Sequence, residues 1–65
     1  MRKNLKDARK RLGLTQPQMA EMIGISTRGY QHMEQGIRIG SYPLWDKLED
    51  ITGVHQRILR ENFEI

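Results

Sequence analysis

The stretch of sequence that decides the fold is TQPQMAEMIGISTRGYQHMEQG, residues 15–36. It predicts two short helices, over about 16–23 and 27–35, which are joined by only three residues, GIS. Gly24 permits the tight turn between them, because glycine adopts a left-handed conformation without a side-chain clash. A helix, a glycine turn and a second helix describe a helix-turn-helix. The apolar residues that recur at helical spacing in the two segments are Met19, Ala20 and Ile23, then Tyr30 and Met33.

Start signals support these boundaries. Thr15, with Gln18 three residues later, fits a capping box, and Ser26 can cap the second helix. Ser41 can cap a later helix, with Pro43 near its start, where a missing N–H is harmless. The glycines that follow helical patterns and end them are Gly13, Gly24, Gly36 and Gly53.

Outside this stretch, the same spacing predicts three more helices, over about 2–12, 42–52 and 55–62. No sustained alternation indicates a strand, so the chain is expected to be an all-α five-helix bundle, a single domain over residues 1–65. The apolar residues behind these three helices are Leu5, Ala8 and Leu12; Leu44, Trp45, Leu48 and Ile51; and Val54, Ile58 and Leu59.

Composition narrows the class of protein. A chain of 65 residues buries a modest core. It has no cysteine, which excludes disulfides and thiolate metal sites. No apolar run approaches the length of a membrane span or a signal-peptide core, so a soluble, intracellular protein is expected. His32 and His55 have no adjacent nucleophile and no metal-ligand spacing, so we expect no enzyme activity, no metal and no cofactor.

Charge is distributed unevenly along the chain. Residues 1–38 hold eight Lys or Arg and three acids, whereas residues 39–65 hold three bases and five acids. The first part therefore suits a polyanion such as nucleic acid and the second does not. A basic surface can also be merely solvated.

The segment 27–35 carries a polar face opposite its two apolar residues. The side chains on that face that can form hydrogen bonds are Arg28, Gln31, His32 and Gln35, with Thr27 at the front edge. Arg can bond guanine with two hydrogen bonds and Gln can bond adenine in the same way, and a helix fits the DNA major groove. Any surface helix has a polar face, but the preceding turn and the charge asymmetry favour contact with bases. Glycine at position 29, within the helix, is explained by close packing, by the approach of a phosphate, or by a neutral change that the fold tolerates.

Phosphate contacts are expected around this segment. Gln16 begins the preceding helix, and its amide and the free N–H groups of that helix end can hold a phosphate. Arg38 follows the segment and can reach the same or the neighbouring strand. Arg11 is a further candidate, whereas solvation is the favoured reading for Lys6 and Lys10.

The stretch LKDARKRLGLTQPQMAEMIGISTRGYQHMEQGIR resembles the phage Cro/repressor-like helix-turn-helix family, often called the Xre family. The similarity runs over about residues 3–59, in the family's order and spacing. It implies a lambda-repressor-like five-helix domain that binds operator DNA, commonly as a dimer on a two-fold symmetric site, in the cytoplasm of a bacterium or at the nucleoid. Family members also serve as antitoxins or as modules whose DNA binding depends on a partner protein, and this alternative stays open.

The resemblance also assigns roles by position. It implies that Thr27, Arg28 and His32 contact bases. It implies that Gln16, Gln31 and Arg38 contact the backbone or flanking positions, and that Arg9 and Glu34 form a structural ion pair. Several residues depart from the family pattern, namely Tyr30 for Ile or Val, Gly40 for Pro, Glu49 for Ala and Thr52 for Leu. The Tyr30 hydroxyl must therefore find a partner or the surface, and Ile51 is a candidate to replace the packing lost at Thr52.

The tail LRENFEI suggests a surface for self-association. Phe63 and Ile65 would share a face on a strand, and Leu59 and Phe63 would share one on a helix. A frayed terminus is equally compatible with the sequence. We therefore expect a weak homodimer through the C-terminal region as one of two alternatives.

Overall fold

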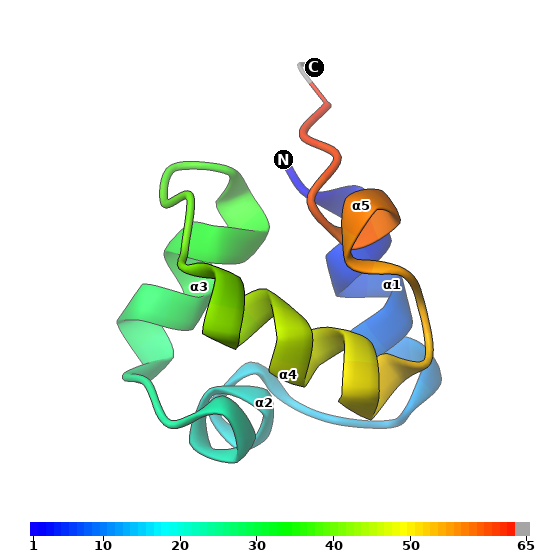
Figure 1. Ribbon diagram of the computed structural model, residues 1–65. Helices are drawn as coiled ribbons and strands as arrows, with labels where there is room; N and C mark the ends of the chain where they lie inside the picture. The colour runs from blue at the N-terminus through cyan, green and yellow to red at the C-terminus, as the bar shows by residue number, and fades with distance from the viewer. Residues whose placement is uncertain (64–65) are drawn as a thin grey trace.

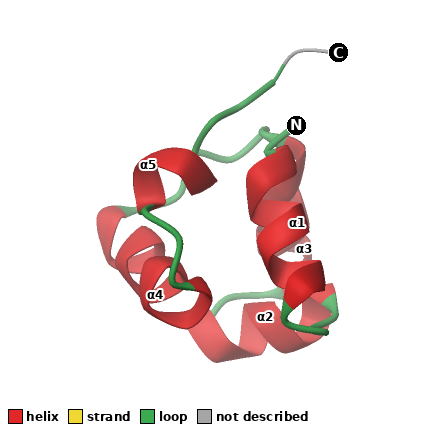
Figure 2. Ribbon diagram, turned by 90° about the vertical axis from the view of Figure 1, so that its right-hand side faces the viewer, coloured by secondary structure: helices red, strands yellow, loops and turns green. Residues whose placement is uncertain are grey.

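The helices follow the spacing of apolar residues closely. The computed structural model describes residues 1–63, and the helices in that range are α1 (Lys3–Arg11), α2 (Gln16–Ile23), α3 (Thr27–Gln35), α4 (Tyr42–Thr52) and α5 (Gln56–Leu59). The described residues include no strand (Figure 2), so the predicted all-α five-helix fold is confirmed. The bounds of α2, α3 and α4 equal the predicted ranges, and α1 is one residue shorter at each end.

Side-chain caps explain why α2 and α3 begin where they do. The Thr15 hydroxyl accepts from the Gln18 backbone N–H at 3.2 Å, and the Gln18 side chain accepts from the Thr15 N–H at 2.8 Å. The Ser26 hydroxyl accepts from the Gly29 N–H at 3.1 Å. Ser41 is the N-cap residue of α4, as predicted, but its side chain makes no cap hydrogen bond. The Leu44 N–H, which such a cap would use, donates to the Ser41 carbonyl at 3.1 Å instead.

The five helices pack as a closed series of neighbours, in the order α1, α3, α2, α4, α5 and back to α1. α4 crosses the front of the molecule in Figure 1, while α1 and α5 lie together on one side. α2 packs against α3 and α4, and α1 packs against α3 and α5. Gly24 makes the turn between α2 and α3 with a φ of 79°, a conformation that glycine adopts without strain. The described ends of the chain meet, since the Phe63 N–H donates to the Met1 carbonyl at 2.9 Å.

The core lies where the inner faces of these helices meet. Its buried apolar residues are Leu5, Ala8, Met19, Ala20, Ile23, Tyr30, Met33, Trp45, Leu48 and Leu59. Leu12 and Ile58 belong to predicted apolar stripes but are largely exposed; Leu12 lies just past the end of α1. No helix within residues 1–63 has the length and apolar character needed to cross a bilayer.

Two departures from the family pattern are accommodated at the end of α4. The Thr52 hydroxyl donates to the Leu48 carbonyl at 2.8 Å and accepts from the Val54 N–H at 3.2 Å. Ile51 packs at the edge of the core, partly buried. Glu49 accepts hydrogen bonds from the Gln56 backbone and side chain. The polar side chains of Thr52 and Glu49, which replace apolar residues of the family pattern, therefore both find hydrogen-bond partners nearby.

The last helix is shorter than the predicted range 55–62, because the residues after Leu59 form hydrogen bonds elsewhere. The Arg60 carbonyl accepts from Arg2 Nε at 3.2 Å, and Asn62 Nδ2 donates to the Gly36 carbonyl at 3.1 Å. Leu59 lies in the core, so the predicted helical surface of Leu59 and Phe63 is wrong. Phe63 itself is exposed, and the alternative that pairs it with Ile65 lies outside the described residues.

Candidate nucleic-acid interface

One face of α3 is anchored in the core and the other is open. Tyr30 and Met33 are fully buried, whereas Arg28 is exposed. Thr27 and His32 are half-buried at the edges of the open face. The remaining polar residues of this face are Gln31, half-buried, and Gln35, exposed. The side chains assigned to base contacts therefore lie on one accessible side of the helix.

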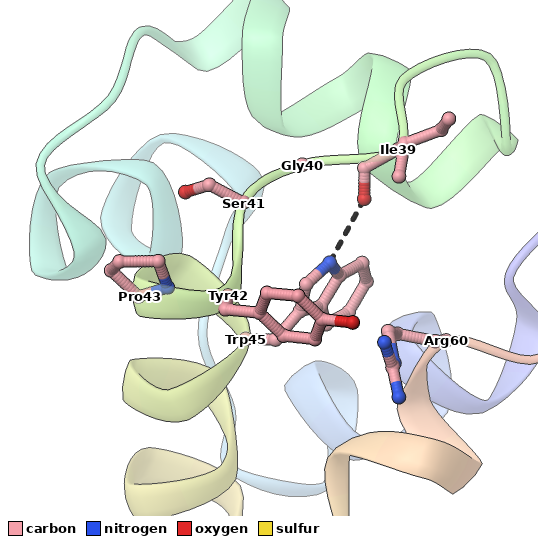
Figure 3. A pocket seen from close by; sticks show the side chains of 7 residues that line it. All are labelled: Ile39, Gly40, Ser41, Tyr42, Pro43, Trp45 and Arg60. Carbon is pink, nitrogen blue, oxygen red and sulfur yellow. Dashed lines mark hydrogen bonds between the residues drawn. The ribbon is translucent and has the colours of Figure 1, made fainter.

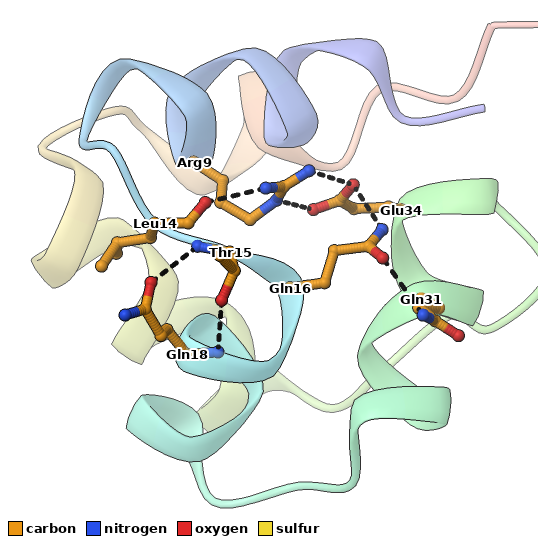
Figure 4. A network of polar contacts seen from close by, with 7 residues as sticks. All are labelled: Arg9, Leu14, Thr15, Gln16, Gln18, Gln31 and Glu34. Carbon is orange, nitrogen blue, oxygen red and sulfur yellow. Dashed lines mark hydrogen bonds and ion pairs between the residues drawn. The ribbon is translucent and has the colours of Figure 1, made fainter.

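A buried ion pair connects α3 to α1. Arg9 Nε donates to Glu34 Oε2 at 2.6 Å, and Arg9 Nη2 donates to Glu34 Oε1 at 3.3 Å (Figure 4). The exposed fractions of the two side chains are 9% and 2%. Arg9 Nη1 also donates to the Leu14 carbonyl at 2.8 Å, ahead of α2. The guanidinium therefore holds the first three helices together and is not available to DNA.

Hydrogen bonding decides the ionisation state of this pair. Burial alone would raise the pKa of Glu34, but the Arg9 guanidinium, the neighbouring Tyr30 hydroxyl and the Gln16 amide together outweigh it and hold that pKa below its ordinary value. The charged Glu34 raises the pKa of Arg9 in turn. Burial raises the pKa of Tyr30, and the charged Glu34 next to its hydroxyl raises it further. The hydroxyl is enclosed, so it does not reach the surface; its polar neighbours are Glu34 and Arg9.

Two glutamines extend the ion pair toward the surface. Gln16 Nε2 donates to Glu34 Oε1 at 3.2 Å, and Gln31 Nε2 donates to Gln16 Oε1 at 3.1 Å (Figure 4). This chain of hydrogen bonds fixes the orientation of both side-chain amides. Each amide nitrogen carries two hydrogens, so each keeps one N–H beyond the bond described here. The start of α2 and the middle of α3 thus present donors side by side.

Arg38 lies in the loop that follows α3, but its side chain extends back along that helix. Its backbone N–H donates to the His32 carbonyl at 3.1 Å. Its Nη1 lies so near Gly29 that a Cβ added there would be 2.6 Å away. The guanidinium is therefore beside the first turn of α3 and not beyond its end.

The other basic candidates lie on α1. Lys10 and Arg11 are exposed near its C-terminal end, and Lys6 is half-buried. None of the three makes a side-chain hydrogen bond or ion pair with residues 1–63. Lys10 and Arg11 lie in the last turn of α1, where cations interact favourably with the helix dipole.

Arg2 has a structural role that the sequence did not indicate. Its Nη1 donates to the Met33 carbonyl at 2.8 Å and to the Arg38 carbonyl at 2.6 Å, and its guanidinium lies over the Trp45 ring at 5.2 Å. Burial lowers the pKa of Arg2, and the charge of Arg60 lowers it further. Nothing in the local pattern distinguishes Arg2 from the neighbouring solvated Lys3, because its partners lie more than 30 residues away.

An open hollow of about 370 Å³ lies between the loop after α3, the start of α4 and the end of α5. Trp45 forms its floor, with Nε1 donating to the Ile39 carbonyl at 2.9 Å, and Arg60 lies over the Tyr42 ring at 5.7 Å (Figure 3). The residues that line it are Ile39, Gly40, Ser41, Tyr42, Pro43, Trp45 and Arg60. It holds no cluster of acids or histidines.

Comparison with known proteins agrees with this geometry. A family model described as helix-turn-helix (HTH_3) matches residues 5–59, which include all of α2 and α3. Searches of curated proteins and of solved structures found no match to the chain. Over most of its length, the chain therefore belongs to the Cro/C1-type, Xre-like helix-turn-helix family of DNA-binding transcription regulators.

Proposed function

We propose that this regulator is a repressor that recognises a two-fold symmetric operator, with α3 as the helix that enters the major groove. The observation that carries the proposal is the contrast across α3. Tyr30 and Met33 hold one side in the core, while Arg28 is exposed on the other. A helix anchored in this way presents its side chains to a groove without distorting the fold.

The base contacts fall to the first turns of α3. Arg28 is the residue best suited to guanine, since its guanidinium can donate to O6 and N7 together. Thr27 and His32 lie at the edges of the open face, where each can contact a base or a thymine methyl group. These three side chains come from positions 1, 2 and 6 of the helix, so they span little more than one turn and can read only a few adjacent base pairs.

The backbone contacts fall to the donors beside this face. Gln16 and Gln31 are hydrogen-bonded to each other at 3.1 Å, so their remaining N–H groups are held in place before DNA arrives. Donors that are already oriented lose less conformational entropy on binding. Phosphate contacts of this kind position the protein without reading sequence.

We further propose a weak homodimer that matches the symmetry of the operator. The supporting surface, which we call the loop–tail surface, consists of the exposed Ile37, Ile39, Tyr42 and Phe63. Ile39 and Tyr42 line one hollow, and the hydrogen bond between Asn62 and Gly36 joins the residues that precede Phe63 and Ile37. Ile37, Ile39 and Tyr42 are 70%, 78% and 71% exposed, and apolar residues gathered in this way mark interaction surfaces. The surface follows the C-terminal end of α3 and leaves Arg28 free. Sedimentation of the wild type and of Ile39→Asp, with and without a palindromic duplex, tests it: a wild type that stays monomeric in both contradicts the dimer.

Selection of bound duplexes from a random pool tests DNA recognition and gives the operator and its symmetry together. Affinity for the selected duplex should fall steeply with salt, because bound Lys and Arg release counterions. Half-sites should be about one helical turn apart if two copies bind. Absence of binding by the chain alone, with binding restored by a cellular protein, would favour the alternative of a partner-dependent or antitoxin-type module.

Substitution separates the two kinds of contact. Arg28→Ala should cost about 1–3 kcal/mol and relax the preference at one base pair. Arg38→Ala should weaken binding to all sequences alike and reduce the salt slope by about one. Lys47→Ala, which removes an exposed charge from α4, is the matched control and should leave specificity unchanged. Equal loss on every sequence for Arg28→Ala would contradict its role in base recognition.

A further inference from the structure

Gly29 lies inside α3, where glycine is a poor choice for the helix. It is the third residue of that helix and the only glycine within α1 to α5. Its φ is not positive, unlike those of the other five glycines, so its backbone conformation does not require glycine. Alanine is more favourable than glycine at helical positions. What the position needs is therefore space and not conformational freedom.

The space above Gly29 is filled by the head of Arg38. A Cβ added at residue 29 would lie 2.6 Å from Arg38 Nη1, 3.7 Å from Arg38 Cζ and 3.1 Å from Ser26 Oγ. Gly29 is buried although it lies at the flank of a surface helix. The backbone of Arg38 is held in place at both ends of the residue, since its N–H donates to His32 and its carbonyl accepts from Arg2. Only the side chain is free to move if this space is filled.

The interactions within residues 1–63 do not explain why the guanidinium lies there. Arg38 is exposed, and its side chain makes no hydrogen bond or ion pair with any described residue. The N-terminal end of a helix carries partial positive charge, which repels a cation. A guanidinium placed over this end with free donors is suited to an anion that binds from outside.

The position of the Arg38 guanidinium relative to the open face of α3 indicates which anion it binds. Gly29 is three residues before His32, so the two share one flank of the helix, whereas Thr27 and Gln31 share the other. Arg38 therefore borders one flank and the Gln16–Gln31 pair borders the opposite one. A helix in the major groove has one phosphodiester strand on each side.

On the basis of the function proposed above, we infer that Gly29 is a positioning residue for DNA binding. The absence of a side chain at residue 29 lets the Arg38 guanidinium lie across the first turn of α3, where it donates to a phosphate on the strand opposite the one held by Gln16 and Gln31. Arg38 thus acts at the start of α3, next to the bases that Arg28 reads, although it follows the helix in the chain.

Gly29→Ala tests this inference because folding and binding should respond differently. The added methyl group displaces the flexible end of Arg38 and requires a small shift of Ser26 Oγ, while alanine favours the helix, so the melting temperature should change little. Affinity for the selected duplex should nevertheless fall on every sequence, and the salt slope should decrease by about one. Arg38→Ala should lose about tenfold in affinity, as expected for one charge-assisted hydrogen bond.

The double variant decides whether Gly29 acts through Arg38. In the Arg38→Ala background, Gly29→Ala should cause no further loss of affinity. In an Arg38→Lys background it should cause a smaller loss than in the wild type, because lysine lacks the planar head that overlaps the new methyl group. Lys47→Ala again serves as the charge-matched control.

Failure of the proposed function and failure of this inference give different results. A wild-type chain that binds no duplex overturns the proposed function, and this inference with it. A wild type that binds, combined with Gly29→Ala that binds equally well, overturns only the inference. The same conclusion follows if Gly29→Ala costs as much affinity without Arg38 as with it, or if Arg38→Ala leaves affinity and salt slope unchanged.

Discussion

Removing the charge of Glu34 is the most informative perturbation of the fold. Its carboxylate accepts from Arg9 Nε at 2.6 Å, from Arg9 Nη2 at 3.3 Å and from Gln16 Nε2 at 3.2 Å. In Glu34→Gln, one of the two oxygens becomes an NH₂ group, which is a donor. At least one of these three donors then faces another donor, and Arg9 keeps its charge in a site where its side chain is 9% exposed.

The magnitude follows from the burial of the pair. Removing one partner of a buried ion pair costs about 3–5 kcal/mol. Arg9 retains its bond to the Leu14 carbonyl at 2.8 Å, and the new amide keeps one acceptor oxygen, so the lower end, about 3 kcal/mol, is expected here. For a domain of this size that corresponds to a fall in melting temperature of roughly 12–24 °C. The total stability of 65 residues is about 3–10 kcal/mol, so the variant should keep about 0–7 kcal/mol and would be close to unfolded at 37 °C if the wild type lies at the lower end.

Urea unfolding at pH 7 and low temperature, followed by circular dichroism and by the fluorescence of Trp45, measures this loss. Gln35→Ala, which changes the exposed neighbour of Glu34, is the control and should shift the free energy of unfolding by less than about 0.5 kcal/mol. The double variant Arg9→Met/Glu34→Leu should be more stable than Glu34→Gln, since it leaves no buried charge. A loss below about 1 kcal/mol for Glu34→Gln would refute the reasoning, because that is the value of a solvated surface pair.

Three further outcomes follow from the same structure. The pKa of Glu34 is held below its ordinary value of 4.5, so the contribution of its carboxylate to stability is complete above that pH and is lost as the pH falls through the folded-state pKa. The free energy of unfolding should therefore fall less steeply with acid in Glu34→Gln than in the wild type. Thr15→Ala should lower the free energy of unfolding by about 1 kcal/mol, whereas Ser41→Ala, which removes no cap hydrogen bond, should change it by less than about 0.5 kcal/mol in matched thermal melts. Arg2→Met removes the guanidinium that donates to one carbonyl near the end of α3 and to one in the following loop, which should cost about 1–3 kcal/mol of stability. Amide hydrogen exchange in that loop should become faster, and unchanged exchange would show that Arg2 does not hold the loop in place.

Features that depend on neighbours in the chain were predictable from the sequence. The Thr15–Gln18 capping box, the Ser26 cap and the turn at Gly24 each involve residues within about three positions of one another. Periodicity of apolar residues then located α2, α3 and α4 and the buried anchors Tyr30 and Met33. Ser41 is a partial exception: it lies at the N-cap position of α4, but the Leu44 N–H donates to its carbonyl and its side chain makes no cap hydrogen bond.

What the tertiary structure decided depends on residues far apart in the chain. The burial of Arg2, the early end of α5 and the chain of hydrogen bonds from Glu34 through Gln16 to Gln31 all join segments at least 15 residues apart. Likewise, the sequence left the reason for Gly29 open, and only the folded loop brings the head of Arg38 onto it. Local spacing specifies which face of a helix is apolar, but the partner of a polar side chain is set by which backbone carbonyls and amides the packed core leaves nearby.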